Sequence, residues 1–156
     1  MKRTVLLICS HALALAIGFA AGVYLLPILI APTGPDPVEV AALAKRAMYS
    51  GEFRRDLQGS DALHWGEGRV SVGPRSISLQ GRLAPGPDYK LYLIRGFVET
   101  ERDFLRLKSQ ALQVGSVKTF DGFVVPVPAS VDVSDYDSVV VWCETFSQFI
   151  TSARYR

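Results

Sequence analysis

Cysteine and histidine are scarce in this sequence, which holds two of each among its 156 residues. Two cysteines cannot build a disulfide-dense scaffold. Beyond the N-terminal apolar run only His64 and Cys143 remain. A closed zinc site takes four ligands, so these two would need carboxylates to complete one. We therefore expect the protein to contain no metal site.

Several common functional motifs are also missing from the sequence. It has no phosphate-binding glycine loop, no Gly-x-Ser-x-Gly elbow and no His-Glu-x-x-His helix. Its 17 basic and 15 acidic residues are interspersed, with a formal net charge of +2. A nucleic-acid-binding protein would usually cluster its basic residues on one face. The interspersed charges disfavour a nucleic-acid partner. The missing motifs leave an enzymatic activity uncertain and favour a non-enzymatic role.

One long apolar run is present, and only one, which excludes a protein with several membrane spans. No charged residue occurs between Thr4 and Ile30, a stretch that would form a helix about 40 Å long. A bilayer core requires about 20 apolar residues. Lys2 and Arg3 precede the run, and the next basic residue is Lys45. This asymmetry predicts a single-pass inner (plasma) membrane protein with its N-terminus in the cytoplasm and its C-terminal domain outside it.

The alternative for this run is a cleaved signal peptide, whose apolar region is usually about 7–15 residues long. The small residues Ala20-Ala21-Gly22 could imitate a cleavage site, but the apolar run continues past them to Ile30. We therefore favour an uncleaved anchor. Residues 1–36 are then predicted to form a cytoplasmic tip, the transmembrane anchor and a proline-rich exit.

The segment Asp36-Pro37-Val38-Glu39 has the features of a helix start. Asp36 can accept hydrogen bonds from free amide groups, proline suits the first helical position, and an acidic residue follows three positions after the cap. We predict a linker helix over residues 37–50, reaching about Tyr49 and stopped by Ser50-Gly51.

Residues 51–156 show the two-residue alternation of β-strands. Short apolar alternations are separated by turn signals such as Gly73-Pro74 and Pro85-Gly86-Pro87-Asp88, and no alternating helices intervene. The apolar alternation occurs at Val70 and Val72, at Ile77 and Leu79, and at Tyr89, Leu91 and Leu93, with a continuous apolar run from Val139 to Cys143. The pattern predicts an all-β domain, an antiparallel β-sandwich outside the cytoplasm.

Cys143 is the most informative residue of this domain. Extracytoplasmic cysteines usually form disulfides, yet this one has no partner cysteine in its domain. It could be a buried small apolar residue, a partner in an intermolecular disulfide, or a redox or ligand-binding residue. His64 could be a hydrogen-bonded structural residue or, within hydrogen-bond reach, a partner of the thiol.

A set of short motifs runs along the domain and ends in an apolar strand that closes with Trp-Cys and is flanked by aromatic residues. The residues of these motifs are Gly51-Glu52-Phe53, His64, Gly66, Gly68, Gly86-Pro87-Asp88, Leu91-Tyr92-Leu93, Asp132, Tyr136, Trp142, Cys143, Phe146, Phe149 and Ala153. In this order they resemble the electron-transfer DM domain family, the thirteenth of its series. One departure is Phe123-Val124-Val125 before Pro126, where the family tends to carry a Gln and an aromatic residue.

The resemblance implies a β-sandwich related to the DOMON haem- and sugar-binding modules, with a cysteine that works in redox chemistry. Cys143 is then the redox candidate and His64 its partner, with haem as one cofactor to consider and the cofactor otherwise unknown. The expected function is a membrane-anchored redox or electron-transfer module, whose partner would be another membrane or periplasmic protein. The alternative is a non-catalytic module for binding a ligand or a protein, in which the cysteine packs the core.

Overall fold

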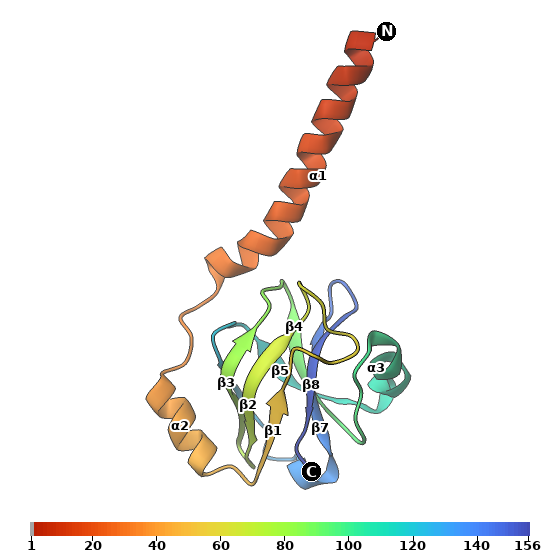
Figure 1. Cartoon of the computed structure of the whole chain (residues 1–156). Helices are drawn as coiled ribbons and strands as arrows, with labels where there is room; N and C mark the ends of the chain where they lie inside the picture. The colour runs from red at the N-terminus through yellow and green to blue at the C-terminus, as the bar shows by residue number, and fades with distance from the viewer. Residues whose placement is uncertain (1) are drawn as a thin grey trace.

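The computed structural model describes residues 2–156 and begins with one long helix, α1 (Lys2–Ile30). α1 is long and apolar enough to cross a membrane, a criterion of length and composition that a signal sequence also meets. Almost all of its side chains are exposed, and its one buried residue is Pro27. In Figure 1 the last turns of α1 lie over one end of the β domain.

The predicted linker helix is present as α2 (Pro37–Lys45), but it is shorter than expected. The Asp36 side chain accepts a hydrogen bond from the Val38 amide at 2.8 Å, as the capping pattern predicted. The expected end near Tyr49 is wrong, because Tyr49–Phe53 form strand β1. Pairing with a neighbouring strand satisfies the backbone of this segment and buries Phe53, which outweighs local helix preference.

Two four-stranded antiparallel sheets form the domain, which confirms the predicted β-sandwich (Figure 1). The first sheet has the order β1-β2-β3-β6 and the second the order β5-β4-β7-β8. The remaining strands are β2 (Gly66–Val72), β3 (Ser76–Leu83), β4 (Tyr89–Ile94), β5 (Leu112–Val117), β6 (Phe123–Pro126), β7 (Ser138–Cys143) and β8 (Gln148–Arg154).

The main core lies between the sheets and follows the two-residue alternation. In β7, Val139, Val141 and Cys143 belong to this core, while Val140 and Trp142 belong to a second apolar cluster on the other face of the sheet. Successive side chains of a strand point to opposite faces, so both assignments follow from the sequence.

The second cluster is covered by a helix that the sequence pattern did not predict, α3 (Glu101–Leu107), followed by a short 3₁₀ turn (Lys108–Gln110). Thr100 caps α3, because its side-chain oxygen accepts a hydrogen bond from the Asp103 amide at 3.2 Å. Phe104 on this helix is fully buried and packs on Trp142, with ring centroids 4.8 Å apart. A small helix thus closes the outer face of the second sheet.

Candidate functional site, a pocket at the end of the sandwich

Cys143 is the last residue of β7 and lies at the end of the inter-sheet core. Its register partners are Tyr89 on β4 and Gln148 on β8. The side chain is only 2% exposed. Its thiol is free, and the second cysteine, Cys9, lies on α1. The thiol is therefore held by strands on both sides.

His64 lies in the loop before β2, and Asp61 holds it there. Asp61 accepts hydrogen bonds from the backbone amides of Leu63 and His64, at 2.7 and 2.8 Å. Its other carboxylate oxygen lies 2.9 Å from His64 Nδ1. This contact with the imidazole, together with the two amides, lowers the pKa of Asp61 below its ordinary value. With Nδ1 engaged, Nε2 is the ring nitrogen left for a ligand or a proton.

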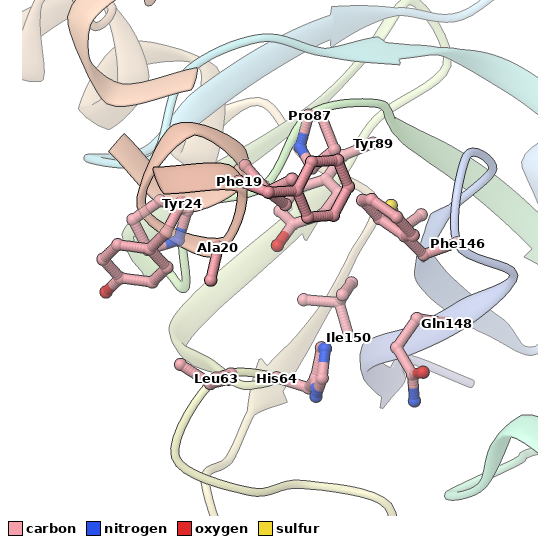
Figure 2. A pocket seen from close by; sticks show the side chains of 14 residues that line it. Phe19, Ala20, Tyr24, Leu63, His64, Pro87, Tyr89, Phe146, Gln148 and Ile150 are labelled. Carbon is pink, nitrogen blue, oxygen red and sulfur yellow. The ribbon is translucent and has the colours of Figure 1, made fainter. Parts of the chain in front are cut away.

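The two residues singled out from the sequence line the same pocket. The pocket has a volume of about 320 Å³ and is bounded by the sandwich end and by α1 (Figure 2). Pockets of about 300–1,000 Å³ hold small-molecule ligands and cofactors. The residues that line it are Phe19, Ala20, Val23 and Tyr24 of α1, the loop residues Leu63, His64, Pro85, Gly86, Pro87 and Phe146, and the strand residues Tyr89, Cys143, Gln148 and Ile150.

Tyr89 is a site residue that the sequence indicates only as part of an alternating strand. Its side chain is 3% exposed, and burial raises the pKa of its hydroxyl well above the ordinary value. The hydroxyl has no hydrogen-bond partner within residues 2–156. Phe120 meets the ring edge-on with centroids 6.0 Å apart, and Gly86 packs directly against it. A fixed hydroxyl without a side-chain partner therefore lines the pocket beside the thiol.

A family profile for electron transfer DM13 matches residues 53–155, which covers the sandwich from the end of β1 to the end of β8. The chain belongs to the electron transfer DM13 family. This confirms the resemblance seen in the sequence. No curated protein and no solved structure matches the chain.

A haem ligated by Cys143 does not fit the pocket of this DM13 domain. Haem iron can take a cysteine thiolate or a histidine as its axial ligand, and both residue types line the pocket. However, an iron at the centre of a macrocycle needs open space around the sulfur. Here the thiol is 2% exposed and is flanked by Tyr89 and Gln148 on the neighbouring strands. Within residues 2–156, no group of three or more His, Cys, Asp or Glu side chains is placed to hold a metal ion.

Next to Cys143, on the other face of the sheet, Glu144 joins a polar cluster of the DM13 domain. Lys108 Nζ lies 2.6 Å from its carboxylate, and the Tyr92 hydroxyl donates a hydrogen bond to it. Lys108 Nζ also lies 5.1 Å from the centre of the Trp142 ring. Burial alone would raise the pKa of Glu144, but the hydrogen bonds from Lys108 and Tyr92 outweigh burial and lower it. The cluster fixes the position of Glu144, the residue that directly follows Cys143.

We expect Glu144→Gln to make the domain less stable at neutral pH and less sensitive to acid. The folded-state pKa of Glu144 lies below its ordinary value of 4.5. Its stabilising contribution is therefore present above about pH 4.5 and is lost as pH falls through the folded-state pKa. Urea unfolding at pH 7 should show a loss of about 1–2 kcal/mol in the free energy of unfolding. The two proteins should converge in acid, and a constant difference down to about pH 3 would contradict this linkage.

Proposed function

We propose that this protein is an electron-transfer module whose redox group is the Cys143 thiol, with His64 as the group that accepts and returns its proton. The observation that carries the proposal is that Cys143 and His64 line one pocket, although they come from a strand end and a separate loop. Family membership supports the electron-transfer class.

The chemistry needs a thiolate, because the thiolate is the reactive form of cysteine. An imidazole that lines the same pocket can take the thiol proton directly or through one bridging water, provided that a third group orients it. Asp61 supplies that orientation through its 2.9 Å contact with His64 Nδ1. The apolar walls of the pocket limit access to small uncharged reagents or to a ligand that fits the space.

The same proposal places α1 as an uncleaved anchor in the inner membrane, with residues 51–156 outside the cytoplasm. Lys2 and Arg3 before α1 and the absence of basic residues until Lys45 support this orientation. The electron donor or acceptor would then be another membrane or periplasmic protein, or a small molecule that enters the pocket.

A second candidate function is a non-catalytic binding module in which the cysteine only fills space. The observation in its favour is that Cys143 belongs to the main core and is 2% exposed. Free cysteines often behave as small buried apolar residues. The two functions differ in whether the thiol reacts while the domain is folded.

The proposed function is tested by oxidising the full chain in lipid nanodiscs, with Cys9→Ser so that Cys143 is the only thiol. We expect dilute hydrogen peroxide to convert Cys143 to the sulfenic acid in the folded protein and dithiothreitol to restore it, as followed by intact mass. His64→Gln should slow the oxidation by on the order of 10²-fold, the usual lower contribution of a positioned base.

His11→Gln is the matched control, because His11 lies on α1 and does not line the pocket. It should leave the oxidation rate unchanged. A thiol that is oxidised only after the domain unfolds would overturn the redox role and support the binding-module function. Equal slowing by both histidine substitutions would overturn the role of His64.

A further inference from the structure

The pocket at the sandwich end has mostly apolar walls. Of the 14 residues that line it, none is Lys, Arg, Asp or Glu. The aromatic rings of Phe19, Tyr89 and Phe146 line it (Figure 2). Aromatic side chains favour flat ring partners in offset-stacked or edge-on contact. The walls therefore suit a neutral ring, and they offer no lysine or arginine to pair with a phosphate or a carboxylate.

The Tyr89 hydroxyl adds one polar donor to this apolar space. The side chain is 3% exposed, and its hydroxyl has no partner within residues 2–156. A hydrogen bond in an apolar space is electrostatically stronger than one in water, so a ligand acceptor placed at this hydroxyl would gain from the contact. In Figure 2, Tyr89 lies on one side of the pocket and His64 and Gln148 lie on the other. A ligand with an acceptor at each end of a flat ring would meet the Tyr89 hydroxyl on one side and the Gln148 side-chain amide on the other.

The position of α1 indicates where such a ligand enters. A bilayer core spans about 20 helical residues, so a span that begins near Thr4 ends near Val23. Phe19, Ala20, Val23 and Tyr24 of this helix form one wall of the pocket. Leu63 and Phe146 are large apolar residues at the pocket that are 55% and 49% exposed. In the proposed anchored orientation, the pocket therefore opens at the outer boundary of the hydrocarbon region.

We propose that this pocket binds the head ring of a membrane-soluble quinone. The ring packs against Phe146 and Tyr89, the Tyr89 hydroxyl donates a hydrogen bond to one carbonyl, and the isoprenoid tail leaves along α1 into the bilayer. A quinone is neutral and flat and carries two carbonyl acceptors, which matches the walls and the donors. The proposal rests on the proposed function for the membrane anchor.

The test uses the full chain in nanodiscs of phosphatidylethanolamine and phosphatidylglycerol, titrated with decylubiquinone. Binding is measured by the quenching of intrinsic tryptophan fluorescence relative to empty nanodiscs with added free tryptophan. We expect saturable binding of one quinone per chain. Tyr89→Phe should weaken it about tenfold, the loss of one hydrogen bond.

Tyr155→Phe is the matched control, because Tyr155 is also buried but donates to the Val133 carbonyl at 2.7 Å and does not line the pocket. It should not change the quinone affinity. Phe146→Ala removes a partly exposed ring and should also weaken binding.

Quenching that does not saturate, or equal affinity in the Tyr89→Phe and wild-type proteins, would overturn the proposal. Displacement of the quinone by oleate at similar concentration would also overturn it, because the pocket would then be a site for acyl chains.

Peroxide oxidation of Cys143 in the same nanodiscs is measured without quinone. Reversible oxidation without quinone binding would overturn only this inference, and quinone binding beside an inert thiol would overturn only the redox function.

Discussion

Replacing Trp142 by alanine is expected to lower the free energy of unfolding of the sandwich by about 3–5 kcal/mol. The Trp142 ring is fully buried in the second apolar cluster. It lies between the outer face of β7 and the helix α3, with Phe104 4.8 Å away and Lys108 above it. Its removal leaves a cavity that a two-turn helix cannot close without losing its own contacts. Because Cys143 follows directly, the end of β7 should also become more mobile.

The matched control is Trp65→Ala, which removes the other tryptophan of the protein. Trp65 is partly exposed, and its main partner is the Arg55 guanidinium, 3.3 Å from the ring centre. A contact of this kind at an exposed site contributes about 0.5–1 kcal/mol. Urea unfolding followed by far-ultraviolet circular dichroism avoids the loss of tryptophan fluorescence. Similar losses in both variants would show that α3 does not seal the outer face of the second sheet.

The second large effect is expected for Gly68→Ala in strand β2. Gly68 has φ +112°, a conformation that L side chains rarely adopt, and its register partner is Gly81. An added Cβ would lie 2.3 Å from the Gln80 carbonyl oxygen, which belongs to the backbone of β3 and cannot move aside alone. The left-handed conformation costs about 1–2 kcal/mol, and the overpacking costs about 1–3 kcal/mol more. We therefore expect a loss of about 3 kcal/mol in the free energy of unfolding.

Gly96→Ala separates the two contributions. Gly96 has φ +89°, but an added Cβ would meet no atom within 4 Å. Only the conformational cost of about 1–2 kcal/mol remains at this position. Both variants are measured by urea unfolding of the full chain. If Gly96→Ala costs as much as Gly68→Ala, the close approach of β2 and β3 at Gly68 is not what requires a glycine there.

The features that the sequence predicted correctly are those encoded by local periodicity. The uncharged run from Thr4 to Ile30 required a long apolar helix, and the alternation in β4 and β7 required strands with two distinct faces. The cap at Asp36 followed from the side chain alone. The family could also be recognised from short motifs, because the Trp-Cys strand end and the Gly-Pro-Asp turn occur in the right order.

The helix α3 and the end of the linker helix escaped prediction, because long-range packing decides both. The helix α3 has only seven residues, so its amphipathic pattern is too short to stand out, although Thr100 with Asp103 carried a capping signal. The end of the linker helix was misplaced because Tyr49–Phe53 gain a strand partner, β2, which lies well beyond them in the sequence. In both cases the deciding free energy comes from burial against a distant segment.

The sequence by itself determined which residues could carry chemistry, since it contains few thiols and imidazoles. It also determined the face of β7 on which the thiol lies, because side chains alternate along any strand. Only the tertiary structure decided that Cys143, His64 and the unpartnered Tyr89 hydroxyl line one pocket beside α1. A strand end, a loop and a membrane-length helix meet there because two sheets close over one core. That closure depends on contacts between segments far apart in the chain, which no local pattern specifies.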